Sequence, residues 1–339
     1  MAKHVVVIGA GPAGLETSAS LAKIGFNVTL VEKEDLSGGH LKKWHALFPS
    51  LMPGHEALDS IRKGLNPLVK MQVSTKITAM EAVNDYFTVT GHNGWQAKAD
   101  AVVMTPGFQL FDARRKEEYG YGIYENVITS ADLEELFASG KELLNRHGRK
   151  PERVGFVHCV GSRDEKVNNL HCSKVCCITA VKQAIEVKQK LPDAEVFCFY
   201  MDLRMFGRHY EELYKEAQEK YNIQFIRGRL SESTEDQDGN VVVKVEDTLL
   251  GKPLRIKTSL LVLMAGMEPR ANTRSLARRM GLKTVSDGFI QPVDEILHSN
   301  YTEIPGMFVA GTCSGPKSGA DTLADARSAA FAVAGFFKK

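Results

Sequence analysis

The sequence predicts an α/β fold with two three-layer domains, each built around a parallel β-sheet. Residues 4–32 and 154–201 both show an apolar β-branched strand, a helix-forming stretch and a second apolar strand. A chain of 339 residues is also longer than a typical single domain. We therefore expect one βαβ-based folding plan to be used twice.

The composition and charge are those of an ordinary globular protein. Hydrophobic residues make up 43% of the chain, and the net charge of +2 gives no field that would favour nucleic acid or a membrane surface. The start MAKHVVVIGAG lacks the long apolar region of a signal peptide. No run reaches the roughly 18 apolar residues of a membrane-spanning helix. We expect a cytoplasmic protein with no membrane span and no nucleic-acid partner.

The first third of the chain begins with a βαβ unit and continues as alternating segments that predict a small meander and a return strand. In chain order we expect strand 4–8, helix 11–23, strand 27–32, a helix near 56–65, and strands 72–80, 86–90 and 97–104.

The rest of the chain repeats the plan after a polar stretch at 147–153. In chain order we expect helices 131–139 and 141–146, strand 154–159, helix 172–191, strand 195–201, helix 210–220, strands 224–227, 239–247, 254–266 and 307–310, and a terminal helix from about 321. These elements predict one domain from 1–110 and 290–339, a linker over 111–150 and a second domain over 151–289.

A glycine turn between the first strand and helix predicts a dinucleotide site. Gly9, Gly11 and Gly14 fit G-x-G-x-x-G. The first glycine makes a tight turn, the second lets backbone approach a pyrophosphate, and the third lets the helix pack on the strand. Glu32 ends the second strand at about the spacing where a carboxylate accepts hydrogen bonds from ribose hydroxyls. One alternative is a glycine turn that binds no ligand. Another is that the dinucleotide bound here is NAD and not FAD.

Four cysteines between residues 159 and 177 predict a metal centre in the second βαβ unit. Cys159, Cys172, Cys176 and Cys177 supply four thiolates, the ligands that iron-sulfur clusters select. Structural zinc and unliganded redox thiols are the alternatives. A lone Gly161 follows the strand here, so the glycine pattern of a second nucleotide site is missing. Cys198 and Cys313 are expected in the core, although Cys313 follows a glycine that would face a cofactor.

Three further segments resemble the glutathione-reductase-like flavoproteins with two dinucleotide-binding domains, a superfamily of two Rossmann-like units. They are Gly38-Gly39-His40, Thr105-Pro106-Gly107 and residues 305–311, PGMFVAG. Thr312 stands where that superfamily usually has Asp. The resemblance implies FAD and the cofactor-binding residues Gly9, Gly11, Pro12, Ala13, Gly14, Glu32, Lys33, Gly39, His40, Leu41, Ile77, Thr105, Pro106, Gly107, Lys182, Gly311 and Thr312.

The segment CVGSRDEKVNNLHCSKVCCITAVKQA, residues 159–184, resembles HdrA, the flavin-binding component of heterodisulfide reductase, and the related QmoA flavoproteins. Residues 120–140 and 315–330 extend the resemblance. It implies that the four cysteines hold one [4Fe-4S] cluster, and that Lys182 lies close to the flavin and acts as its catalytic cation. The chain lacks the additional C-x2-C-x2-C runs of larger members.

The compact length resembles the HdrA-like component of the sulfur-oxidising heterodisulfide-reductase-like complex. This resemblance implies an oxidoreductase subunit that transfers electrons in thiol/disulfide or persulfide metabolism. It implies HdrB- and HdrC-like subunits and a lipoate-binding protein as partners, and a homodimer. The alternatives are an NAD(P)H-dependent disulfide or ferredoxin reductase and a non-catalytic flavin scaffold with a structural cluster.

Overall fold

The computed structural model describes residues 2–338, and the chain divides into two compact units. The first unit contains residues 1–42, 54–109 and 268–339, and the second contains 43–53 and 110–267. The division differs from the expected one at three places. Residues 43–53 and the expected linker 111–150 lie in the second unit, and residues 268–289 lie in the first. The cause is packing. Leu276 and Ala277 of α6 (Ala271–Met280) are buried in the first unit's core, whereas β11 (Val127–Thr129) joins the second unit's sheet.

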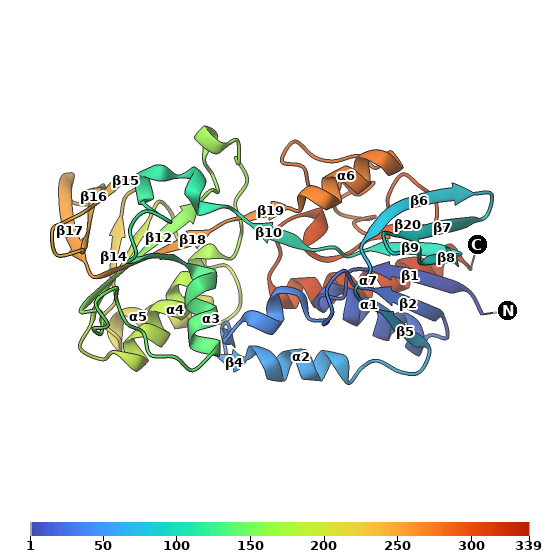
Figure 1. Cartoon of the computed structure of the whole chain (residues 1–339), viewed down its shortest axis with the longest axis horizontal. Coiled ribbons are helices and arrows are strands. Elements are labelled where there is room, and N and C mark those ends of the chain that lie inside the picture. The colour runs from blue at the N-terminus through green and yellow to red at the C-terminus, as the bar shows by residue number, and fades with distance from the viewer. Residues whose placement is uncertain (1, 339) are drawn as a thin grey trace. The chain divides into compact units, whose positions relative to one another are not determined.

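The first unit is built on a five-stranded parallel sheet in the order β20-β9-β1-β2-β5 (Figure 1). Val6 of β1 pairs with Thr29 of β2 on one side and with Val102 of β9 on the other. The central strands are almost continuously apolar, as strands covered on both faces require. The strands are β1 (His4–Ile8), β2 (Asn27–Val31), β5 (Val69–Gln72), β9 (Ala101–Met104) and β20 (Met307–Val309).

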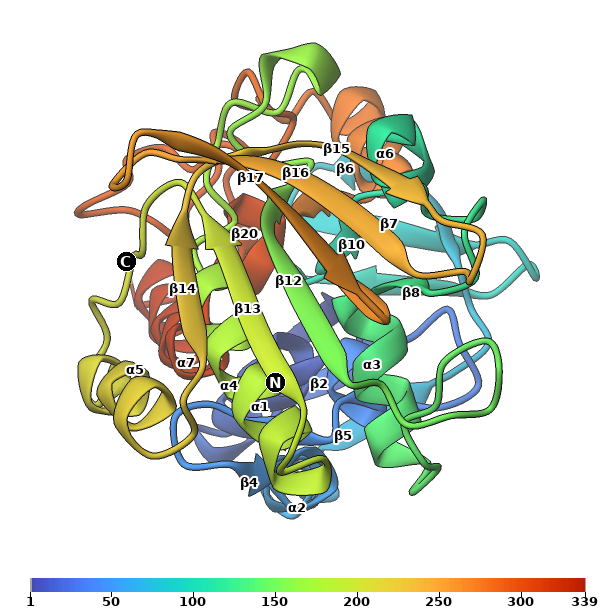
Figure 2. The same cartoon turned by 90° about the vertical axis from the view of Figure 1, so that its left-hand side faces the viewer.

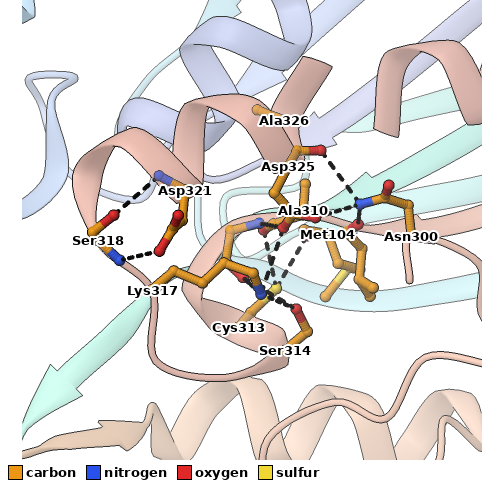
Figure 3. Close-up of polar contacts among 12 residues, drawn as sticks. Met104, Asn300, Ala310, Cys313, Ser314, Lys317, Ser318, Asp321, Asp325 and Ala326 are labelled. Carbon is orange, nitrogen blue, oxygen red and sulfur yellow. Dashed lines mark hydrogen bonds and ion pairs between the residues drawn. The ribbon is translucent and has the colours of Figure 1, made fainter. Parts of the chain in front are cut away.

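Helices cover one face of this sheet, and an antiparallel meander with α6 covers the other. α1 and α7 pack against each other, and the α7 N-terminus is closed by a capping box between Ser318 and Asp321 (Figure 3). The meander buries Met80, Phe87 and Val89 against the sheet. These elements are α1 (Pro12–Lys23), α2 (Gly54–Arg62), α7 (Gly319–Phe336), β6 (Ile77–Val83), β7 (Tyr86–Gly91) and β8 (Gln96–Ala99).

The second unit repeats the plan with a parallel sheet in the order β11-β18-β12-β13-β14. Figure 2 shows the meander β15–β17 over one face of this sheet and α3, α4 and α5 on the other. The elements are β12 (Arg153–Val160), β13 (Glu195–Tyr200), β14 (Gln224–Arg227), β18 (Leu260–Ala265), β15 (Leu230–Glu235), β16 (Val241–Asp247), β17 (Lys252–Thr258), α3 (Ser130–Ala138), α4 (Cys176–Lys190) and α5 (Tyr210–Glu219).

Short elements complete the described chain. Two pairs of short strands form, β3 (Ala46–Leu47) with β4 (Met52–Pro53) and β10 (Phe108–Leu110) with β19 (Met267–Pro269). Single 3-10 turns lie at Gly39–Lys43, Ala113–Arg115, Glu117–Tyr119, Glu165–Val167 and Gly311–Ser314. Within residues 2–338, no helix combines the length and apolarity needed to cross a bilayer.

Two helix expectations require correction, and one further helix was missed. Residues 141–146 are not helical, because Gly140 at φ +67° ends α3 and Asn145 then forms a turn in which its N–H donates to Arg149 O. α4 begins at Cys176 rather than Cys172, because Lys174 has φ +64°. α6 was not expected. Its sequence ANTRSLARRM carries few apolar residues, so the helical period is weak.

Candidate functional site

The glycine turn between β1 and α1 is open above one glycine and closed around the other two. Gly9 has φ +107°, and a Cβ there would lie 2.4 Å from the Thr105 carbonyl oxygen. A Cβ on Gly14 would lie 1.8 Å from the Gly9 oxygen, so the helix can approach the strand only because Gly14 has none. Above Gly11 the nearest atom would be 4.0 Å away. Ligand and backbone can therefore meet at Gly11, as a pyrophosphate turn requires.

The first turn of α1 presents uncapped amide groups. Gly11 is its N-cap and makes no side-chain cap, Pro12 follows at the first helical position, and no acidic residue lies in the first turn. Ala13 packs against Gly311, where an added Cβ would come within 2.6 Å of the Ala13 Cβ. The helix N-terminus thus offers hydrogen-bond donors and a partial positive charge to an anion.

A buried carboxylate lies beside this turn. Glu32 is 7% exposed and accepts hydrogen bonds from the Ala10 N–H at 2.7 Å and the Glu34 N–H at 3.1 Å. Lys33 is half-exposed and pairs with Glu34 at 3.1 Å, so its ammonium is a surface group. Ile77 begins β6 and is partly buried against the first unit's core. The structure therefore holds the Glu32 carboxylate in place at the end of β2.

The residues that follow Glu32 in the chain pack against the glycine turn. Gly39 has φ +56°, and a Cβ there would lie 3.1 Å from Gly11 Cα. His40 stacks on Phe108 with ring centroids 4.4 Å apart, and Leu41 is buried. Gly39 therefore allows a second backbone segment to approach the open side of Gly11.

The end of β9 fixes the turn from a third side. Thr105 Oγ1 donates to the carbonyl oxygens of Ile8 at 3.0 Å and Gly9 at 2.8 Å. Pro106 follows, and Gly107 has φ +74° and faces the Thr312 hydroxyl, 3.8 Å from where a Cβ would lie. These contacts hold the end of β9 against the glycine turn.

Charged groups that the sequence did not indicate organise the loop after β20. The Gly311 N–H donates to Asp325 Oδ2 at 2.7 Å, and Lys317 Nζ donates to Gly311 O at 3.1 Å and to the Ser314 hydroxyl at 2.8 Å (Figure 3). Asp325 comes from α7. The loop after β20 is therefore held in place by a carboxylate from a helix that lies later in the chain.

Arg270 is a partly buried arginine of the first unit, and its charge interacts with that of Glu32. The Nε of Arg270 is buried and has no hydrogen-bond acceptor among residues 2–338. Burial lowers the pKa of this guanidinium, and Glu32 and Glu34 partly offset the effect. An orphaned donor, a carboxylate and an open glycine turn on one unit fit the sugar and phosphate groups of a dinucleotide. No motif in the sequence pointed to Arg270.

The cysteine loop takes the place that the glycine turn has in the first unit. β12 ends at Val160 and α4 begins at Cys176, so residues 161–175 separate strand and helix. Cys159 has φ +59° at a register shift of β12, and Cys176 and Cys177 are the first two residues of α4. Cys172 lies in the loop and is partly exposed. The loop thus brings thiols to the helix N-terminus.

Three of these thiols form a buried group. The sulfurs of Cys159 and Cys176 are 3.7 Å apart, and Cys177 Sγ lies 3.5 Å from Asp202 O. Hydrogen bonding with Cys176 lowers the pKa of Cys159 to about 7 and, with help from His158, that of Cys177 to about 4. The same contacts and burial raise the pKa of Cys176. Cys159 and Cys177 therefore favour the thiolate form, in which cysteine binds metals, whereas Cys176 does not.

The thiols fit a metal centre by donor type. Across residues 2–338 no three His, Cys, Asp or Glu side chains already stand in a metal-holding arrangement. Two thiolates bound to one tetrahedral ion with bonds of about 2.3 Å would lie about 3.8 Å apart, close to the Cys159–Cys176 separation. That spacing alone suits zinc, whereas the all-cysteine set with an adjacent pair suits an iron-sulfur cluster. A zinc ion and an iron-sulfur cluster would both be bound by the same four cysteines.

The other two cysteines are core residues. Cys313 is fully buried, donates to Met104 O at 3.2 Å, and has its pKa raised to about 12 by burial (Figure 3). Cys198 is also fully buried, and burial raises its pKa strongly.

Lys182 lies on α4 in the second unit, inside a buried ionic group. Its ammonium contacts Glu134, lies 3.0 Å from Glu186 Oε2 and donates to Ala46 O at 3.1 Å. Lys182 is 1% exposed, and Glu134 and Glu186 are 4% and 3% exposed. Burial raises the pKa of Glu186, which Lys182 partly offsets, and His45 Nδ1 lies 2.8 Å from the same carboxylate. The i,i+4 spacing of Lys182 and Glu186 was the available sequence signal.

A family model described as pyridine nucleotide-disulphide oxidoreductase matches residues 3–135 and 183–330. The match stops before the cysteine loop and resumes after it. The part of the chain that carries the four cysteines therefore departs from the general pattern of the family.

Curated relatives are named as HdrA components of heterodisulfide reductases. The HdrA iron-sulfur protein of the CoB–CoM heterodisulfide reductase of Methanocaldococcus jannaschii is 44% identical over 242 residues, covering 70% of this chain and 37% of the relative. The HdrA protein of the ferredoxin/F420H2-dependent CoB–CoM heterodisulfide reductase of Methanosarcina acetivorans is 30% identical over 402 residues, covering 93% and 51%. The chain thus spans between about a third and a half of the length of these relatives.

Solved structures share the fold at low sequence identity. Thioredoxin reductase of T. acidophilum has a TM-score of 0.69 at 19% identity, covering 99% of this chain and 100% of that one. Lactococcus lactis thioredoxin reductase has a TM-score of 0.69 at 18% identity, covering 98% of both chains. The two Rossmann-like units predicted from the sequence are therefore confirmed. The chain belongs to the pyridine nucleotide-disulphide oxidoreductase family and is a homologue of HdrA, a component of heterodisulfide reductase.

Proposed function

We propose that this chain is an electron-transfer protein that binds one FAD and one [4Fe-4S] cluster and works in a heterodisulfide-reductase-like complex. The observation that supports this most directly is the second βαβ unit, where the end of β12, the following loop and the start of α4 carry four cysteines in place of the glycine turn on which a pyridine nucleotide would rest. Electrons would then reach the flavin without a nicotinamide bound in this unit.

The first unit supplies the flavin site in this proposal. Gly9, Gly11 and Gly14 bring backbone and the α1 amide groups to the pyrophosphate, and Glu32 accepts from the adenosine ribose. The remaining cofactor-binding residues follow the order of the chain: Pro12, Ala13, Lys33, Gly39, His40, Leu41, Ile77, Thr105, Pro106, Gly107, Gly311 and Thr312. When bound, FAD exchanges electrons in pairs or singly and a [4Fe-4S] cluster exchanges them singly, so together they can convert one pattern into the other.

The second unit supplies the metal ligands Cys159, Cys172, Cys176 and Cys177 and the cation Lys182. We assign Lys182 the catalytic role of stabilising negative charge on the reduced flavin. Its contacts with Glu134, Glu186 and Ala46 hold the ammonium at one position.

The partners are proposed from the resemblance to the HdrA-like component of the sulfur-oxidising heterodisulfide-reductase-like complex. HdrB- and HdrC-like subunits would carry the thiol/disulfide chemistry, and a lipoate-binding protein would present a sulfur substrate. A homodimer would place two copies in the complex.

Anaerobic potentiometric titration of the purified chain tests the function. We expect both cofactors to be reduced reversibly, and NADH or NADPH alone to leave the flavin oxidised on the seconds timescale. Rapid stoichiometric reduction by a pyridine nucleotide would instead support an NAD(P)H-dependent reductase. A cluster that keeps one oxidation state throughout would support a structural role.

A further inference from the structure

His158 is a buried imidazole that the proposed function does not yet use. It lies in β12 directly before Cys159 and is 7% exposed. Both ring nitrogens are buried, and within residues 2–338 neither has a partner at normal hydrogen-bond geometry. A neutral imidazole always carries one N–H donor and one acceptor nitrogen. Because a buried polar group left unpaired destabilises the fold, this environment needs an explanation.

The neighbours of His158 indicate which acceptor it lacks. The Cys177 side chain lies within hydrogen-bonding reach of the imidazole, and His158 directly precedes Cys159 in β12. The Tyr200 ring lies on another side of the His158 imidazole, with the two ring centroids 6.3 Å apart. The imidazole is therefore held between an aromatic ring and two of the predicted metal ligands.

We propose that His158 donates a hydrogen bond to sulfur of the iron-sulfur centre held by the four cysteines, and thereby raises its reduction potential. This rests on the proposed function. A donor aimed at cluster sulfur stabilises the extra electron of the reduced state, and hydrogen bonds to sulfur are a recognised determinant of cluster potential. His158 acts as a positioning residue, because four thiolates already complete the ligand set.

The test compares full-length variants purified anaerobically, with the midpoint potential measured by EPR-monitored titration. His158→Phe keeps a flat ring and removes both nitrogens. We expect a tenfold fall in the ratio of reduced to oxidised centre at a fixed potential, which is a shift of about 59 mV to lower potential for a one-electron couple. His158→Gln retains an amide donor and should fall between Phe and the native protein. His147→Phe, at an exposed histidine bound to Asp238 O, should leave the potential unchanged.

A native-protein measurement covers the case in which His158→Phe fails to take up iron. In protein labelled with 15N-histidine, pulsed EPR of the reduced centre should show one weak nitrogen coupling. No coupling, or a strong coupling typical of direct ligation, would overturn the inference. So would an unchanged midpoint potential in a His158→Phe variant with native iron content. Protein that contains zinc and no iron would instead refute the proposed function itself.

Discussion

Replacing Lys182 with Met removes the ammonium from a buried group that also holds two carboxylates. Lys182 is 1% exposed, lies 3.0 Å from Glu186 Oε2 and contacts Glu134, and both acids are almost fully buried. Removing one partner of a buried ion pair costs about 3–5 kcal/mol, because it leaves charge without compensation. For a unit of this size, about 2–4 °C per kcal/mol converts this to a fall in Tm of about 6–20 °C.

The loss should depend on pH. Burial raises the pKa of Glu186 in the folded protein, and Lys182 acts against this shift. An acid with a raised folded pKa binds its proton more tightly in the folded chain, so stability is retained below the ordinary carboxyl pKa of about 4.3 and is lost as pH rises through the folded value. Without Lys182 that folded value rises further. The difference between variant and native protein should therefore be smaller near pH 4.5 than near pH 8.

Urea unfolding followed by circular dichroism at both pH values measures this difference. Lys215→Met is the matched control, because Lys215 is exposed and pairs with Glu219 only at 3.8 Å on the surface of α5. It should change the free energy of unfolding by less than about 1 kcal/mol. Adding Glu134→Gln to Lys182→Met should recover part of the loss. If Lys182→Met lowers the free energy of unfolding by less than about 1 kcal/mol at pH 8, or by an amount that does not change with pH, Lys182 does not compensate the two buried carboxylates.

Three further substitutions test other parts of the account. Gly14→Ala should lower FAD affinity at least tenfold in a flavin fluorescence titration, because its Cβ would lie 1.8 Å from a backbone oxygen of the glycine turn; Gly335→Ala, with only a 3.8 Å contact, should bind normally. Asp164→Asn should lower stability by about 3 kcal/mol at pH 7, because it removes a 2.7 Å ion pair with Lys116. Burial alone would raise the pKa of Asp164, but the hydrogen bond from Lys116 outweighs it and lowers that pKa. The stability difference between variant and native protein, measured by urea unfolding, should therefore disappear as pH falls below the ordinary pKa of Asp. Cys198→Ala should leave the iron content measured by metal analysis unchanged, whereas loss of iron would show that this buried thiol is a ligand.

Periodicity and glycine chemistry were enough to predict the two parallel sheets and the glycine turn. Buried parallel strands such as β1 and β9 are continuous apolar runs, and Gly9 and Gly14 are required by contacts only about 2 Å long. Such local constraints are visible in a single sequence. The short β-branched strands and the helix that follows each of them are therefore recognisable without a structure.

Long-range contacts could not be predicted in this way. Asp325 reaches Gly311 from α7, and Glu134 reaches Lys182 from a different helix, so neither pairing leaves a local pattern. α6 forms because Leu276 and Ala277 are buried by distant strands, although its own sequence is mostly polar. The boundary near residue 110 likewise depends on which sheet β11 joins. Tertiary packing decides each of these features.

Metal and flavin analysis of anaerobically purified protein determines whether the chain holds one FAD and one [4Fe-4S] cluster. We expect about one FAD and about four irons per chain, with a rhombic EPR signal after reduction. A Cys172→Ser variant should lose iron and retain FAD, because Cys172 lies in the second unit while the glycine turn lies in the first. Stoichiometric zinc without iron, or FAD lost together with iron, would contradict the account.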